Sequence, residues 1–260
     1  MAEQTDTVVY VYGIVPADTE VESGTSGVGD PPGEVRLVRH GDLAALVSDV
    51  HADKPLGRPQ DLVTHEELLD SAVQGVAVLP LRFGAVVTDD KAVANELLDE
   101  HHDEFADALE QLEGRVEYVV KGRYDERAVL GKVLSENQEA GALREQLKGK
   151  DENATRDERI RLGEIVNESV SAYRERDTQA LGDALEGHVE ASVVREPTHE
   201  LDAVHTAFLV ETDKAPDLER ALGKLGRDWE GRVQLQLIGP LAAYDFVGAP
   251  QPTAGEPAGR

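Results

Sequence analysis

The sequence contains no cysteine, which excludes disulfides, thiolate catalysis and zinc sites built on thiolates. Aromatic residues make up only 4% of the chain, so valine, leucine and alanine must form most of the core. No apolar run approaches the length of a membrane span, and residues 1–7 lack the apolar region of a signal peptide. We therefore expect a soluble, cytoplasmic protein without membrane contact.

Cations are scarce: 26 Lys and Arg stand against 52 Asp and Glu, for a net charge of −26. Such a charge opposes binding to nucleic acid and to anionic membrane surfaces. Two interpretations of the acidity remain. The acidic surface could meet a basic partner, or it could reflect a very salty cytosol, where self-repulsion is screened. Because the acidic residues are spread along the chain, we favour the second interpretation and a halophilic source.

The 260 residues suffice for one large domain or two small ones. From residue 115 onward the pattern predicts a strand, helices, two strands, a helix and a strand, which is the ferredoxin-like, split β-α-β order. We predict an α+β fold of two small domains, with mixed or antiparallel sheets and helices on one face. The expected limits are 1–122 (a ferredoxin-like variant), 123–248 (ferredoxin-like, with strand 115–122 in either domain) and a disordered tail, 249–260.

The segment 76–87 is an apolar run interrupted by Pro80 and Arg82. Such a run predicts a strand, and Pro80 places it at a sheet edge or a bulge because proline has no N–H to donate. Arg82 then either pairs with one of many carboxylates or contacts a partner. The aromatic residues that follow Pro240 pose a similar choice, between covering the end of a core and forming a binding hot spot.

Candidate catalytic and metal-binding patterns are weak. The Gly-rich stretch 24–29 lacks the Gly-Lys-Ser/Thr of a phosphate loop. His65 begins a pattern similar to a zinc helix, but Leu69 stands where the second histidine belongs. His101 and His102 would point about 100° apart on a helix. We therefore predict no enzyme activity, no metal and no cofactor.

Three segments together resemble the gas vesicle protein F/L family. They cover about residues 7–247 in order and spacing. The segments are Tyr10-Val11-Tyr12-Gly13-Ile14-Val15; Val78-Leu79-Pro80-Leu81-Arg82-Phe83-Gly84, followed by a helix and Gly114-Arg115-Val116-Glu117-Tyr118-Val119-Val120-Lys121; and Ile238-Gly239-Pro240-Leu241-Ala242-Ala243-Tyr244-Asp245-Phe246-Val247.

The resemblance implies an accessory protein of gas vesicle formation, associated with gas vesicles. Its partners would be the small hydrophobic shell protein and other accessory proteins. The Arg-containing motif and the length favour the L type, and the acidity fits a haloarchaeal source. The candidate partner-binding residues are Leu79, Arg82, Phe83, Pro240, Tyr244 and Phe246. The alternative is a small-molecule-binding or dimerising ferredoxin-like module of a halophile, unrelated to gas vesicles.

Overall fold

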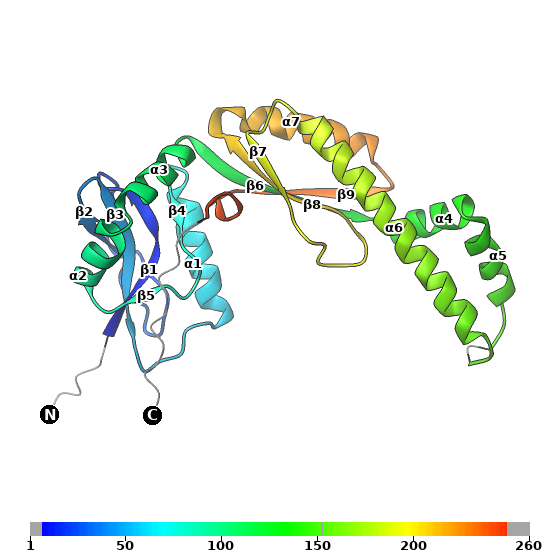
Figure 1. Ribbon diagram of the computed structural model, residues 1–260, viewed down its shortest axis with the longest axis horizontal. Coiled ribbons are helices and arrows are strands. Elements are labelled where there is room, and N and C mark those ends of the chain that lie inside the picture. Colours follow the sequence, from blue (N-terminus) through cyan, green and yellow to red (C-terminus); the bar gives the residue numbers. More distant parts are fainter. Residues whose placement is uncertain (1–6, 152, 249–260) are drawn as a thin grey trace. The chain divides into compact units, whose positions relative to one another are not determined.

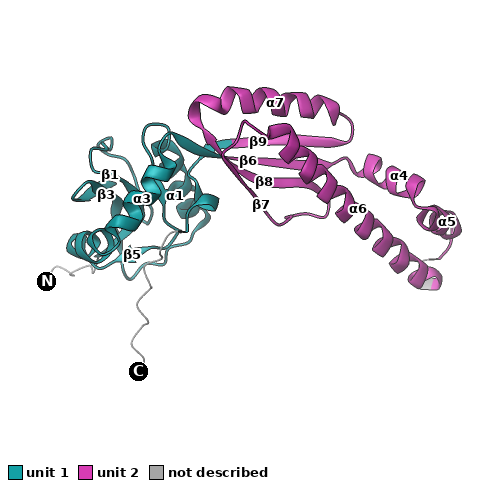
Figure 2. Cartoon of the chain, turned by 45° about the horizontal axis from the view of Figure 1, so that its top comes forward, with its two compact units in different colours: residues 1–117, 239–260 teal, residues 118–238 magenta. Residues whose placement is uncertain are grey.

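The structure is a computed structural model that describes residues 7–151 and 153–248. The chain forms two compact units, residues 1–117 with 239–260 and residues 118–238 (Figures 1 and 2). Each unit combines helices with a sheet whose described strand pairs are antiparallel, which confirms the α+β class.

The first unit is built around strand β1 (Thr7–Pro16), a run of β-branched and aromatic residues. β1 pairs with β3 (Leu43–His51), which forms a hairpin with β2 (Arg36–His40). Gly41 supplies the positive φ, +61°, that this tight turn requires. On its other side β1 pairs with the two-residue strands β4 (Leu79–Pro80) and β5 (Val86–Val87).

Helices cover both faces of this sheet. Helix α1 (Pro59–Ala72) lies on the face of Gly13, where a Cβ would approach the Leu69 side chain at 3.1 Å. Helix α3 (His102–Leu112) contacts β4 on the other face, and the short helices α2 (Asp90–Ala92) and η1 (Val93–Asp99) precede it. The prediction of helices on one face is therefore wrong for this unit. The continuous burial of residues 43–48 explains the difference, since such strands are covered on both sides.

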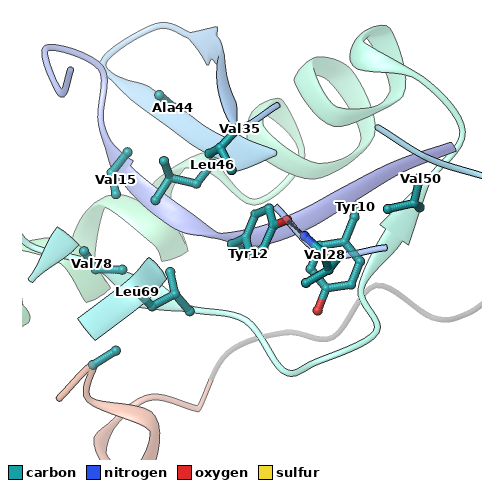
Figure 3. Close-up of a cluster of buried hydrophobic side chains, with 11 residues drawn as sticks. Tyr10, Tyr12, Val15, Val28, Val35, Ala44, Leu46, Val50, Leu69 and Val78 are labelled. Carbon is teal, nitrogen blue, oxygen red and sulfur yellow. Dashed lines mark hydrogen bonds between the residues drawn. The ribbon is translucent and has the colours of Figure 1, made fainter. Parts of the chain in front are cut away.

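The core on the α1 side is a cluster of valine and leucine side chains around Tyr10 and Tyr12 (Figure 3). The two tyrosine rings meet edge to face, with centroids 4.8 Å apart. Both hydroxyls form hydrogen bonds. That of Tyr12 lies 2.8 Å from Oγ of Ser48 and accepts from the Val28 N–H, and that of Tyr10 bonds to His65 of α1. Ala242, far along the sequence, belongs to the same cluster.

In the second unit the strands follow the order β7-β8-β6-β9, namely Ala191–Val194, Asp202–Glu211, Arg115–Tyr124 and Val233–Leu241. Helices α6 (Arg156–Leu185) and α7 (Ala215–Asp228) lie along this sheet (Figure 2). The Tyr124 hydroxyl donates to Asp177 of α6, which fixes the helix-covered face of β6. The remaining helical segments are α4 (Glu126–Glu136), α5 (Gln138–Leu147), η2 (Asn153–Thr155) and η3 (Thr212–Lys214).

The compact units differ from the domain limits expected from the sequence, 1–122 and 123–248. The division falls after Glu117 within β6 and before Gly239 within β9, so residues 239–248, with the short helix η4 (Tyr244–Phe246), group with the first unit. The expected disordered tail, 249–260, lies outside the described residues. In the described ranges no helix combines the length and apolarity needed to cross a membrane.

Candidate functional site around His65

The segment 79–87 runs beside β1 at one edge of the first sheet. β4 and β5 pair with β1, and between them the Leu81 N–H donates to the Tyr12 carbonyl over 2.9 Å. The edge position predicted from Pro80 is confirmed, since β4 ends the strand order. The single strand over 76–87 is wrong: residues 82–84 form a turn in which Gly84 has a φ of +96°.

His65 of α1 lies beneath this turn, with only 2% of its surface exposed. Its Nδ1 is 2.9 Å from the Tyr10 hydroxyl, and its Nε2 is 3.1 Å from the Leu81 carbonyl oxygen and 2.9 Å from the Tyr244 hydroxyl. The Gly84 N–H donates to the Tyr10 hydroxyl in turn. One buried imidazole thus joins β1, the turn and the C-terminal segment.

This network defines the tautomer of His65. A carbonyl oxygen can only accept, so Nε2 carries the proton that points to Leu81. Nδ1 is then an acceptor, and the Tyr10 hydroxyl donates to it. The Tyr244 hydroxyl oxygen shares the Nε2 proton. A neutral imidazole satisfies all these bonds, whereas a proton on Nδ1 would break the bond from Tyr10.

Burial sets the protonation states around the network. Desolvation lowers the pKa of His65 to about 4, against the smaller opposing effect of the Leu81 carbonyl. Burial also raises the pKa of Tyr10, and burial followed by the nearby Asp70 carboxylate raises that of Tyr244. Both phenols and the imidazole are neutral at pH 7, so the cluster holds no charge at its centre.

The C-terminal segment is fixed to the first unit by two carboxylates, of which that of Glu117 is buried and that of Asp70 is half-buried. The Ala242 N–H donates to Asp70 of α1 over 2.9 Å, and the Asp245 N–H donates to Glu117 over 3.1 Å. Glu117 is 1% exposed, and desolvation raises the pKa of Asp70. Because buried carboxylates need hydrogen bonds, these contacts specify where residues 242–245 lie.

The predicted partner-binding residues separate into different places. Phe83 and Tyr244 pack near the His65 ring, with centroids 5.7 Å and 6.4 Å away. Leu79 and Phe246 instead line a hollow of about 240 Å³ beside Phe105 of α3. Leu79 itself is 1% exposed, so the hollow reaches its edge only.

Arg82 and Pro240 stand apart from both groups. Arg82 is exposed at the turn, and its side chain makes no hydrogen bond or ion pair with any described residue. The predicted ion pair between Arg82 and a neighbouring carboxylate is therefore not seen in the described part of the chain. Pro240 is half-buried and follows a cis peptide bond from Gly239.

Sequence reasoning did not identify His65, Asp70 and Glu117 as organising residues. The sequence does place His65 on the apolar stripe of its helix, beside Leu69. An imidazole buried there without hydrogen-bond partners would cost free energy, so this position could have indicated a buried network. Within the described ranges, no three histidine or carboxylate side chains are grouped to hold a metal ion.

The fold and the joined segments define a two-unit α+β protein whose motif residues meet at a buried histidine. The family described as "Gas vesicle synthesis protein GvpL/GvpF" matches residues 8–248, and the chain belongs to this family. It is 39% identical to gas vesicle protein F of Streptomyces sp. (strain CB03234) over 92% of this chain and 98% of that protein. Gas vesicle protein L of the same strain is 30% identical, over 94% of each chain.

The fold is similar to the crystal structure of GvpF from Anabaena sp. PCC7120, with a TM-score of 0.75, 24% identity and coverage of 92% of this chain and 97% of that one. The expectations of an L type and of a haloarchaeal source are not supported. The Streptomyces F protein is more similar to this chain than the L protein.

Proposed function

We propose that this protein is a cytoplasmic accessory factor of gas vesicle formation that binds the small hydrophobic shell protein and other accessory proteins during assembly. Family membership supports the gas vesicle role. The observation that supports binding is the exposed Arg82 side chain at the turn beside the β4 edge, which makes no hydrogen bond or ion pair with any described residue. The greater similarity to protein F favours the F type.

The proposed mechanism is protection of an apolar subunit. A small hydrophobic shell protein would aggregate before assembly, and the sheet edge at β5, where Val86 is 42% exposed, can pair with an extended segment of it. The hollow beside Phe105 would take an apolar side chain. The net charge of −26 would keep such a complex in solution.

The strand order of the second unit supports the finer fold assignment made from the sequence. The order β7-β8-β6-β9 places the two strands that follow helices at opposite edges, as in a split β-α-β arrangement. We infer that residues 118–238 are ferredoxin-like. The alternative of a small-molecule-binding or dimerising module unrelated to gas vesicles has less support, because the family match spans 8–248.

Capture of the shell protein by immobilised protein tests the proposal. Arg82→Ala should weaken capture by about thirtyfold if the guanidinium is desolvated in the complex. Arg82→Lys keeps the charge but not the planar fork, so it should recover capture only in part. Arg220→Ala, at an exposed arginine of α7, is the matched control. Unchanged capture by Arg82→Ala would contradict the assignment of this turn.

A further inference from the structure

The sheet of the second unit has a face turned away from α6 and α7 that carries two cations. Side chains alternate along a strand, and Tyr124 points to α6, so Gly122 lies on the helix-covered face. Lys121 and Arg123 therefore lie together on the opposite face. Arg123 is 58% exposed, and Lys121 is half-buried.

The neighbouring strand β9 adds two amides to the same face. A Cβ on Gly122 would meet the side chains of Val233 and Leu235 at 3.2 Å and 3.0 Å, so these residues share its helix-covered face. Gln234 and Gln236 alternate with them and are exposed. Two strands thus present two cations and two amide groups on one side.

These four side chains line a hollow of about 500 Å³, together with Thr198 and Asp202 from the connection before β8. The Asp202 carboxylate is committed to that connection, where Oδ2 accepts from the N–H groups of Thr198 and His199. Its Oδ1 lies 3.7 Å from Arg123, a long ion pair. Lys121 has no hydrogen bond or ion pair with any described residue. In a chain with twice as many acids as bases, two weakly paired cations side by side are unusual.

The edge of the sheet beside the hollow also lacks charged side chains. β9 ends the strand order, and Figure 2 shows it along one side of the sheet. Residues 233–241 carry no charge, although 30% of the chain is charged. Sheet edges are commonly guarded by charged residues against pairing with another chain. An uncharged edge strand therefore marks a position where an extended segment can add.

We propose that the β9 edge and the hollow lined by Lys121 and Arg123 bind an extended acidic segment of another protein. The segment pairs with β9 through its backbone, and its carboxylates lie between the two cations and the two glutamine amides. A second copy of the chain or a nucleic acid would bring many negative charges against a chain of net charge −26, whereas a short segment brings only a few carboxylates, which the two cations pair locally. This site is independent of the proposed gas vesicle function.

Binding of two blocked synthetic peptides to the full chain tests the proposal. One peptide alternates valine and glutamate, and the other has glutamine in place of glutamate. At the lowest salt concentration at which circular dichroism shows the chain folded, fluorescence anisotropy should show the glutamate peptide binding at least about fivefold more tightly, and further added salt should reduce the difference. Equal affinity for the two peptides, or no binding of either, would overturn the proposal.

Variants locate the site. The double variant Lys121→Gln with Arg123→Gln should remove the preference for the glutamate peptide. The control, Lys224→Gln with Arg227→Gln, makes the same charge change at exposed positions of α7 and should retain that preference. Circular dichroism checks that both pairs fold. Equal loss in both pairs would show an effect of net charge only and contradict the site. Displacement of the peptide by inorganic phosphate at a similar concentration would show a simple anion site and overturn the extended-segment assignment.

Discussion

The hydroxyl of Tyr244 lies 2.9 Å from Nε2 of His65, a contact between residues 179 positions apart in the sequence. Together with the bond from the Ala242 N–H to Asp70, it fixes the C-terminal segment to helix α1. The primary role of Tyr244 is therefore structural. A partner that contacts this segment would meet a surface whose conformation His65 determines.

Tyr244→Phe should lower the free energy of unfolding by about 1 kcal/mol, because it removes the hydroxyl and keeps the ring. His65→Gln removes the other side of the contact. Since the two groups share one network, the double variant should cost less than the sum of the single variants. Denaturant unfolding of the four proteins measures the coupling, and strict additivity would show that the contact contributes nothing.

Stability should depend on pH through His65. Its pKa is about 4 in the folded protein and about 6.5 when unfolded, so between these values the unfolded chain binds more protons. The contribution is complete above about pH 6.5 and is lost as the pH falls toward 4. The shift corresponds to about 3 kcal/mol. The difference between wild type and His65→Gln, followed by denaturant unfolding across this range, isolates it from the carboxylates, and a constant difference would contradict it.

Arg82→Ala should change the free energy of unfolding by no more than about 0.5 kcal/mol, because the exposed side chain has no bonded partner among the described residues. Arg39 is a matched comparison. It is also exposed, but its guanidinium donates to the carbonyls of Ala17 and Thr19, so Arg39→Ala should cost about 1 kcal/mol. Equal losses in thermal or denaturant unfolding would show that Arg82 has a structural partner.

Gly27→Ala should destabilise the first unit by several kcal/mol, on the order of the largest single substitutions. An added Cβ would overlap the Tyr12 hydroxyl and lie 2.7 Å from Oγ of Ser48, both buried. Gly131→Ala is the control: it lies in α4 with open space around the added carbon, and it should stabilise by about 1 kcal/mol. A neutral Gly27→Ala in thermal unfolding would show that residues 18–33 shift freely.

The acidity also predicts a salt response. If the protein comes from a salty cytosol, circular dichroism should show loss of structure in dilute buffer and recovery in molar salt, as screening removes self-repulsion. An unchanged spectrum and melting temperature would rule out salt-dependent folding and leave the acidic surface to be explained by a basic partner.

Local pattern was sufficient for some elements. The β-branched and aromatic run in 7–15, the glycine at Gly41 between two apolar segments and the apolar stripe around Leu69 each indicate the observed element, because the signal lies within a few residues. The edge position of Pro80 followed from its missing N–H.

Contacts between distant segments could not be read in this way. Nothing local to His65 indicates Tyr10 or Tyr244 as its partners, and nothing near Ala242 indicates Asp70. The interruption at 82–84 depends on how Gly84 is placed over the Tyr10 hydroxyl, which again is a tertiary relation. The fold class can be predicted from the periodicity of apolar residues, whereas these sites depend on tertiary contacts between residues that are distant in the sequence.

The first unit is discontinuous, and this has a consequence for synthesis. Residues 239–248 leave the ribosome after the whole of 118–238, so the nascent first unit has β1, α1 and the 79–87 turn but lacks Ala242 and Tyr244. Asp70 gains the Ala242 N–H, and Nε2 of His65 gains the Tyr244 hydroxyl, only when translation is nearly complete. This surface can therefore complete its fold only at the end of translation. A truncated chain would lack these hydrogen bonds and would present an incompletely folded surface to any chaperone or partner.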